Sequence, residues 1–407
     1  MNCRHCGATL DQLFLDLGFA PPSNAYLTAA DLHRPERTFP LRLWTCTACW
    51  LVQVEDHAGA EDLFTRDYAY FSSTSTTWLE HAARYARDVI QRLALDKTSL
   101  VLEIASNDGY LLKNFVAAGI PCLGIEPTAS TAAAADAQGV PTLREFFSLA
   151  LAQRLAGEGR QADLIAGNNV YAHVPAIDDF TRGLKALLKP GGVVTLEFPH
   201  VRRLIEQAQF DTVYHEHFSY LSLFTVQRIF AAAGLRVWDV EELPTHGGSL
   251  RIYGCHAGDS RPQQDRVAQV LAAEEKAGLR KVETYRAFQA RANRIKDDLL
   301  RFLIEEKRAG RTVAAYGAAA KGNTLLNYAG VRPDLLPYVC DAAPSKQGKY
   351  LPGSHIPVVA PAVLEERKPQ RLLILPWNLA PELTRQNAAI REWGGRFVVA
   401  VPELRVD

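Results

Sequence analysis

The chain has 407 residues, of which 48% are hydrophobic and 22% charged, and its 45 basic and 45 acidic residues give a formal net charge of +0. This length exceeds what a single hydrophobic core usually serves, so we expect two or three domains. The composition excludes a disordered or fibrous protein. The balanced charge argues against general electrostatic binding to nucleic acid or an anionic membrane, although a local basic pocket for a phosphate fits it.

The N-terminal sequence MNCRHCG lacks the basic and then apolar segments of a secretory signal. No apolar run in the chain is long enough to cross a bilayer. We therefore expect a cytoplasmic protein without a membrane partner, in which the seven cysteines are metal ligands or buried thiols rather than disulfides.

Two C-x₂-C pairs mark the start of the chain, Cys3 with Cys6 and Cys46 with Cys49. Two such pairs complete a tetrahedral thiolate shell, which predicts a structural Zn²⁺ in a zinc-ribbon-like module, with a loop or strand excursion between the pairs. Four unrelated cysteines or a redox pair are the alternatives, and His5 is a less favoured replacement ligand. Zinc ribbons often bind nucleic acid, which supplies a rival hypothesis that the neutral charge disfavours.

Residues 98–115 read as a strand, a small polar turn and a helix, and a second strand over 122–127 ends in Glu126. This is the first unit of a doubly wound α/β sheet, in which an acid at that place binds ribose hydroxyls. Ala105 stands where the first glycine of a dinucleotide-binding turn is expected, and only Gly109 remains. That departure argues against NAD or FAD, whose pyrophosphate needs close backbone approach.

S-adenosylmethionine has no phosphate, so a polar turn between Glu103 and Glu126 suits it better. Further strands are expected over 162–170, 191–199, 235–244 and 248–256. The last two form the antiparallel hairpin that ends a seven-stranded methyltransferase sheet. The alternative for any one element is a plain α/β sheet without a ligand.

The C-terminal part begins with a long helical run over 263–309, followed by a strand, a small-residue turn and a helix over 311–328. The backbone of residues 317–323, with Lys321, suits a diphosphate at a helix N-terminus, the alternative being a tight packing turn. Asp341 ends the strand that follows, where it would touch a ribose or a base.

The stretch DTVYHEHFSYLSLF (211–224) concentrates side chains that move protons or bind metal. It admits three interpretations, namely a metal site, an acid–base centre or a structural polar corner. Methyl transfer from a sulfonium needs no metal, so the acid–base interpretation is favoured. His215 is expected to be structural.

Seven motifs, taken in order, resemble those of the zinc-containing C-methyltransferases that act on nucleotide-linked 4-keto-deoxysugars. They extend over nearly the whole chain, and Ala105 is the main departure. The motifs are DYAYFSSTS (67–75), EIASNDG (103–109), NNVYAHVP (168–175), YHEHFSY (214–220), HGGSLRIY (246–253), YGAAAKGNTLLN (316–327) and CDAAPSKQGKYLPGSHIPV (340–358).

The resemblance implies a zinc-binding module (1–75), a class I methyltransferase domain (76–256) and a Rossmann-like α/β domain that binds the nucleotide sugar (257–407). It implies methyl transfer from S-adenosylmethionine to a ring carbon, in the first instance C-3, of a dTDP- or GDP-linked 4-keto-deoxysugar by a monomeric enzyme. An O- or N-methyltransferase is the alternative enzyme, and a zinc-ribbon nucleic-acid-binding protein the alternative outside enzymes.

Carbon methylation next to a ketone requires loss of an α-proton, for which a histidine with a pKa near the operating pH is suited. The resemblance assigns this base to His217, with Tyr214 and Glu216 as its partners and Tyr70 reaching in from the N-terminal side. The expected cofactor-binding residues are Glu103, Asn107, Asp108, Gly109, Glu126, Asn168, Asn169 and His173. The expected substrate-binding residues are Gly317, Lys321, Asn323 and Asp341.

Overall fold

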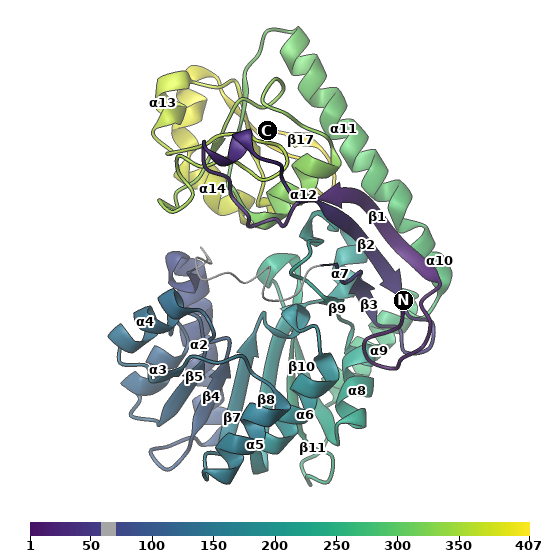
Figure 1. Cartoon of the computed structure of the whole chain (residues 1–407), viewed down its shortest axis with the longest axis vertical. Helices are drawn as coiled ribbons and strands as arrows, with labels where there is room; N and C mark the ends of the chain where they lie inside the picture. The colour runs from purple at the N-terminus through teal and green to yellow at the C-terminus, as the bar shows by residue number, and fades with distance from the viewer. Residues whose placement is uncertain (58–70) are drawn as a thin grey trace.

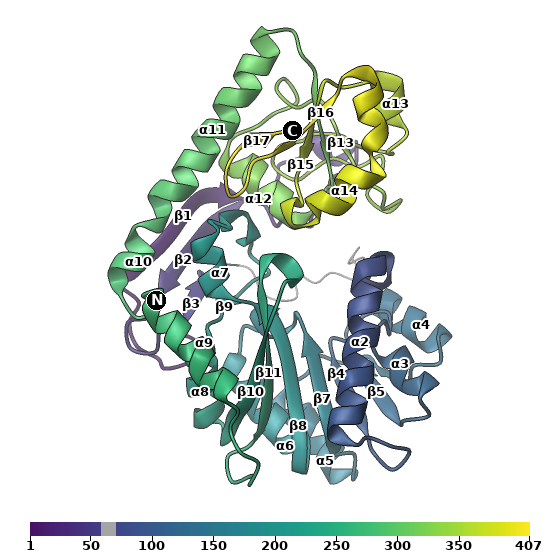
Figure 2. The same cartoon turned by 180° about the vertical axis from the view of Figure 1, so that it is seen from behind.

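The computed structural model describes residues 1–57 and 71–407 and contains three β-sheets (Figure 1). The seven-stranded sheet forms the lower half of Figure 1, and the C-terminal six-stranded sheet lies above it. A four-stranded sheet built mainly from N-terminal residues runs along the long helix α11 (Phe288–Arg308), as the view from behind also shows (Figure 2).

The four-stranded sheet has the order β1-β2-β3-β9, and all its pairs are antiparallel. Its strands are β1 (Gln12–Ala20), β2 (Phe39–Thr45), β3 (Val52–Val54) and β9 (Ser219–Tyr220). The strand excursion expected between the two cysteine pairs is therefore present. Because β9 forms the end of the motif YHEHFSY (214–220), called the YHEH motif below, this sheet holds one end of that motif.

The seven-stranded sheet has the order β10-β11-β8-β7-β4-β5-β6, in which β11 alone runs antiparallel to its neighbours. Its strands are β4 (Val101–Ile104), β5 (Cys122–Ile125), β6 (Thr142–Leu143), β7 (Ala162–Asn168), β8 (Leu188–Pro199), β10 (Leu235–Leu243) and β11 (Ser249–His256). The sequence predicted these strands except β6, and the antiparallel closing hairpin is confirmed. This is the class I methyltransferase topology.

Helices cover both faces of this sheet. On β4, Val101 packs in one buried cluster with residues of α2 and α3, whereas Leu102 packs in another with residues of α5, α6 and α8, as strand alternation requires. The helices on its faces are α2 (Thr76–Leu93), α3 (Leu112–Ala117), α4 (Ala129–Ala137), α5 (Leu149–Gly157), α6 (Ile177–Leu187) and α8 (Leu223–Ala232). Helix α7 (Val201–Glu206) packs instead with residues of the other two sheets.

The helical run predicted over 263–309 is three helices rather than one, namely α9 (Asp265–Lys276), α10 (Val282–Arg286) and α11 (Phe288–Arg308). The first break falls at Gly278, which has a φ of +77°. A glycine adopts this left-handed conformation without steric cost, so periodicity alone overestimated the helix.

The C-terminal sheet has the order β14-β13-β12-β15-β16-β17 and is parallel except for β17. Its strands are β12 (Val313–Tyr316), β13 (Val339–Cys340), β14 (Val358–Val359), β15 (Arg371–Ile374), β16 (Arg396–Val399) and β17 (Arg405–Val406). Its helices are α12 (Ala320–Tyr328), α13 (Val363–Arg367) and α14 (Ala380–Gln386). The Rossmann-like strand–turn–helix expected over 311–328 is β12 followed by α12.

One buried cluster joins the four-stranded and six-stranded sheets, because it contains Leu43 of β2, Val213 of the segment before β9, and Val313 of β12. The domain boundaries expected at residues 75/76 and 256/257 stay predictions, and β9, from the central part of the chain, pairs with β3 of the four-stranded sheet. In the described ranges, no helix combines the length and the apolar character that a membrane span requires.

Candidate functional site

The four paired cysteines converge on one point. Their Sγ atoms all lie within 4.8 Å of one another, with Cys3 and Cys49 at 3.5 Å and Cys6 and Cys46 also at 3.5 Å. A tetrahedral Zn²⁺ shell with Zn–S bonds of 2.3 Å separates its sulfurs by about 3.8 Å, so the set fits this ion. Four thiolates close the shell and leave no position for a substrate, which indicates a structural role.

His5 does not belong to this cluster. Its Nδ1 atom lies 2.7 Å from Oδ1 of Asp178, at the start of α6. The histidine inside the first cysteine pair therefore connects the N-terminal module to the methyltransferase sheet.

The turn after β4 has the conformation of a glycine-rich turn although it contains only one glycine. Ala105 and Asn107 have φ values of +57° and +50°, and Gly109 has a φ of +78°. The sequence departs from the usual pattern at Ala105, but the backbone does not. The left-handed conformation of an alanine carries a cost of about 1–2 kcal/mol, which marks the turn as held in place by its surroundings.

Glu126 holds this turn from the end of β5. Its carboxylate accepts hydrogen bonds from the backbone N–H groups of Asn107 (3.0 Å) and Thr128 (2.8 Å), and the residue is 5% exposed. It thus lies where an acid contacts the ribose of a bound nucleoside, and that contact stays a prediction.

Several buried polar atoms at the carboxyl ends of β4 and β7 have no hydrogen-bond partner in the described parts of the chain. They are Oδ1 of Asp108 and the side-chain oxygens of Asn168 and Asn169, whereas the nearby carboxyl of Glu103 has Tyr110 as a hydrogen-bond partner and a pKa that burial raises well above its ordinary value. Buried polar atoms are normally satisfied, so the cluster indicates a polar ligand. Its acceptors and the acid on β5 fit the amino group and ribose of S-adenosylmethionine.

The segment before α2 is tied to this turn. The N–H of Ser72 donates to the side-chain oxygen of Asn107 (2.9 Å), and the N–H and hydroxyl of Ser73 donate to Oδ2 of Asp108 (3.0 and 2.5 Å). These serines belong to the DYAYFSSTS motif. Tyr70, in the same motif, lies outside the described residues.

Sequence reasoning missed a network at the end of β8. Glu197 is fully buried and accepts hydrogen bonds from His81 (2.9 Å), Arg251 (2.7 Å) and Thr245 (2.9 Å). Burial raises the pKa of Glu197, but the hydrogen bond from His81 and the charge of Arg251 outweigh it and lower the pKa to about 2. The position of Glu197 at a parallel strand's carboxyl end was the available signal.

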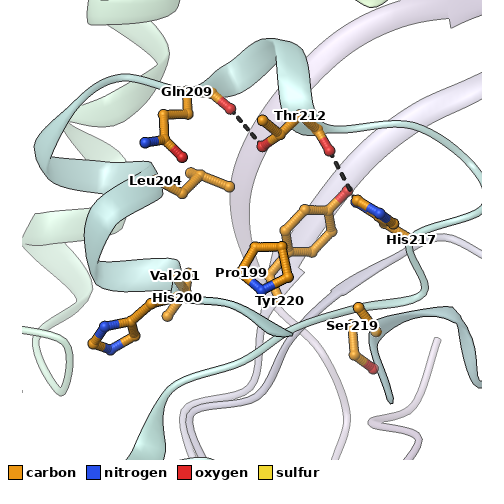
Figure 3. A pocket seen from close by; sticks show the side chains of 10 residues that line it. Pro199, His200, Val201, Leu204, Gln209, Thr212, His217, Ser219 and Tyr220 are labelled. Atoms are coloured by element: carbon orange, nitrogen blue, oxygen red, sulfur yellow. Dashed lines mark hydrogen bonds between the residues drawn. The ribbon is translucent and has the colours of Figure 1, made fainter. Parts of the chain in front are cut away.

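His217 is buried, and its Nδ1 atom lies 3.0 Å from the carbonyl oxygen of Thr212 (Figure 3). A carbonyl only accepts hydrogen bonds, so Nδ1 carries the proton and Nε2 keeps its lone pair. Burial lowers the pKa of His217 well below 6.5, and the charge of a nearby His173 acts in the same direction. His217 is therefore a neutral imidazole with one basic nitrogen.

Aromatic rings surround this imidazole. The ring of Tyr214 lies 3.9 Å from that of His217 between centroids, and the ring of His173 lies at 4.6 Å. Nδ1 of His173 donates to the backbone carbonyl of Glu216 at 2.8 Å. The structure thus places His173, which we expected among the cofactor-binding residues, directly against His217.

The side chains of Glu216 and His215 have hydrogen-bond partners in the N-terminal part of the chain. Both carboxylate oxygens of Glu216 accept from Nδ2 of Asn24 (2.9 and 2.8 Å), and burial raises the pKa of Glu216 to about 7. The residue that orients the imidazole in this structure is Thr212, not Glu216. Nε2 of His215 lies 3.2 Å from the carbonyl oxygen of Pro40, which agrees with its expected structural role.

Two of the four expected substrate-binding residues meet at the ends of β12 and β13. The N–H of Gly317 donates to the carbonyl of Cys340 (2.8 Å), and Asp341 accepts from the N–H of Ala318 (2.7 Å). Gly317 has a φ of +90°, and a Cβ there would lie 2.5 Å from Pro376, so glycine is required.

The other two, Lys321 and Asn323, lie on α12. Nδ2 of Asn323 donates to the carbonyl of Ser23 (2.6 Å), in the N-terminal module. Nζ of Lys321 donates to Oδ1 of Asn378 at 2.6 Å, next to Trp377. Burial lowers the pKa of Lys321, and the charge of Asp211 opposes the shift. The expected diphosphate contact of Lys321 stays a prediction.

Three protein-family models match successive parts of the chain. They describe a zinc-binding domain (residues 3–64), a methyltransferase domain (78–240) and a C-methyltransferase C-terminal domain (244–402). The C-methyltransferase NovU of Streptomyces niveus is 34% identical over 405 residues, which cover 100% of this chain and 96% of NovU.

Solved structures match the central part. An S-adenosylmethionine-dependent methyltransferase from Clostridium acetobutylicum ATCC 824 is 11% identical, with a TM-score of 0.36, covering 44% of this chain and 92% of that one. The glycopeptide N-methyltransferase MtfA in complex with sinefungin is 14% identical, with a TM-score of 0.35, covering 43% of this chain and 94% of that one.

Proposed function

Because the chain belongs to the zinc-containing, S-adenosylmethionine-dependent C-methyltransferases, we propose that it methylates a ring carbon of a nucleoside-diphosphate-linked 4-keto-deoxysugar. Within this class we assign the reaction to C-3, one of the two ring carbons next to the ketone. S-adenosylmethionine supplies an electrophilic methyl group to that carbon. The four-cysteine zinc site stabilises the N-terminal module and takes no part in the chemistry.

The observation that carries the proposal is the bond between Nδ1 of His217 and the carbonyl of Thr212. It leaves Nε2 as a buried base of fixed direction. A carbon next to a ketone becomes a nucleophile only after its proton is removed, and a positioned histidine performs that removal. In this step the proton moves from carbon to Nε2, and the electron pair moves toward the ketone oxygen.

The remaining side chains have supporting roles. Tyr214 and His173 confine the imidazole by ring contact, and Glu216 and Tyr70 are proposed to contact the sugar. Glu103, Asn107, Asp108, Gly109, Glu126, Asn168 and Asn169 would hold the cofactor at the carboxyl end of the sheet. Gly317, Lys321, Asn323 and Asp341 would hold the nucleotide sugar on the C-terminal sheet.

Incubation of the enzyme with dTDP- and GDP-linked 4-keto-deoxysugars and methyl-labelled S-adenosylmethionine tests the proposal. The labelled methyl group should appear on a ring carbon in the NMR spectrum of the product. A methyl group on oxygen or nitrogen would contradict the reaction class, and methylation of a carbon other than C-3 would contradict the assigned position.

A further inference from the structure

The C-terminal part of the chain bonds both neighbours of Thr212, through the side chain of Asp211 and the backbone of Val213. Nε1 of Trp377 donates to Oδ2 of Asp211 at 2.7 Å. The hydroxyl of Thr324, on α12, donates to the carbonyl of Val213, also at 2.7 Å. The residue between these two anchors is the one whose carbonyl accepts from His217. Two side chains of the C-terminal part therefore fix the peptide that orients the imidazole.

Trp377 is closely packed at the place where the two parts meet. A Cβ on Gly247 would lie 2.4 Å from its ring, so this glycine accommodates the indole. Nζ of Lys321 lies 4.7 Å from the centroid of the same ring. Farther along the chain, Glu382 accepts a hydrogen bond from Thr77 of α2 at 3.0 Å. The C-terminal part therefore contacts the central part through Trp377 and through Glu382.

Asp211 is fully buried, and its Oδ1 atom has no hydrogen-bond partner among the residues that the structure describes. Burial raises the pKa of Asp211 to about 6, against the charge of Lys321 and the hydrogen bond from Trp377. A buried carboxylate is costly and is poor evidence of a stabilising role, so a role in fixing local geometry accounts for it better. Its partners in that role, Lys321 and Trp377, both belong to the C-terminal part.

We propose that Trp377 and Thr324 are positioning residues for the catalytic base, acting through Asp211 and Val213 on the carbonyl of Thr212. This inference rests on the proposed role of His217. Separation of the C-terminal part would free the 211–213 backbone, and the imidazole would lose the acceptor that selects its tautomer. Nε2 would then carry a proton in a fraction of molecules and could not accept one. The base is competent only while the nucleotide-sugar-binding part is docked.

The test compares Trp377→Phe, which keeps an aromatic ring and removes the N–H, with Thr324→Val, which removes the hydroxyl. Trp393→Phe is the matched control, because Nε1 of Trp393 bonds the carbonyl of Pro369 (3.1 Å) within the C-terminal part. We expect kcat to fall about ten- to a hundred-fold in both test variants, because a misplaced reacting group slows the reaction by up to about a hundred-fold. KM for S-adenosylmethionine should change less than about threefold, since neither substituted residue belongs to the turn after β4 that we expect to bind the cofactor.

The second readout is the tautomer of His217, seen by ¹⁵N NMR and assigned by the signal missing in His217→Asn. The wild type and Trp393→Phe should show protonated Nδ1, and Trp377→Phe and Thr324→Val a mixture. Wild-type turnover with an unchanged tautomer in both test variants overturns the inference, as does a rise in KM alone. The tautomer measurement needs no substrate. It therefore tests this inference separately if the wild type proves to methylate oxygen or nitrogen, which would refute the proposed function itself.

Discussion

The rings of Tyr214 and His217 face each other with centroids 3.9 Å apart and planes inclined by 35°. The phenol ring therefore restrains the imidazole by packing. Ring contact of this kind contributes about 0.5–1.5 kcal/mol beyond the buried area.

Tyr214→Phe should consequently be milder than Tyr214→Ala. We expect a loss of about tenfold or less in kcat for phenylalanine, which keeps the stacked ring, and a larger loss for alanine. Steady-state kinetics of both variants at saturating cofactor measure the difference. Equal losses would show that the hydroxyl, rather than the ring, is what the reaction needs.

One zinc ion per chain is expected in purified protein, and Cys46→Ser should reduce the metal content and the melting temperature together. The four Sγ atoms form one cluster, so the loss of any thiolate opens the shell. Cys122→Ser, at a half-buried cysteine outside the cluster, is the matched control. Metal-free wild type of full stability would refute the structural role.

Glu126→Ala should weaken binding of S-adenosylmethionine about tenfold or more, because a hydrogen bond to a charged group contributes about 1.5–3 kcal/mol. The side chain also holds the N–H groups of Asn107 and Thr128, so the turn itself should loosen. Titration calorimetry provides the measurement. Glu145→Ala, which removes a partly exposed partner of Arg154, is the control and should bind normally. Unchanged affinity in Glu126→Ala would remove this residue from the site.

The pH dependence of kcat/KM should have its acid limb below pH 6.5. The pKa of His217 is lowered well below 6.5, chiefly by burial, and the reaction needs the neutral form. Activity is thus fully present above that pH and is lost as the pH falls through the pKa of the folded enzyme. An acid limb centred above pH 7 would exclude His217 as the titrating group.

The melting temperature, measured in the same buffers, shows at which pH the protein unfolds, so the acid limb of kcat/KM can be told apart from acid denaturation. Burial lowers the pKa values of His173 and His246 to about 4, so both histidines are neutral in the folded protein at pH 5. Unfolding lets them take up protons below pH 6.5. The melting temperature should therefore fall as the pH is lowered from 6.5 toward 4.

Short-range patterns in the sequence were sufficient for the zinc cluster, for most strands of the central sheet and for the first strand–turn–helix of the C-terminal sheet. They did not reveal the left-handed backbone of Ala105, because that conformation is imposed by contacts with the ends of β4 and β5. The sequence showed a glycine at position 278 but did not show that the helix breaks there. Helical periodicity continues on both sides of it.

The orientation of the base could not be predicted for a different reason. The bond from His217 to Thr212 depends on the backbone of a nearby residue, and that backbone is held by Trp377, which lies 166 residues from Asp211 in sequence. Side-chain type identifies neither a backbone acceptor nor a contact at that separation. The sequence offered Glu216 as a residue that orients His217 or binds the sugar; its carboxylate bonds Asn24, and its contact with the sugar stays a prediction.

The central claim is that His217 removes the α-proton of a 4-keto sugar, and its most direct test is hydrogen exchange in D₂O. Wild-type enzyme with a nucleotide-linked 4-keto-deoxysugar and S-adenosylhomocysteine should introduce deuterium at the carbon that becomes methylated. His217→Asn should lose this exchange while still binding both ligands. Its turnover should fall about 10²–10⁴-fold, as expected on removal of a positioned base. His215→Asn is the control and should exchange normally, because the His215 ring bonds the carbonyl of Pro40 and packs against Phe39. Exchange at the wild-type rate in His217→Asn would contradict the account.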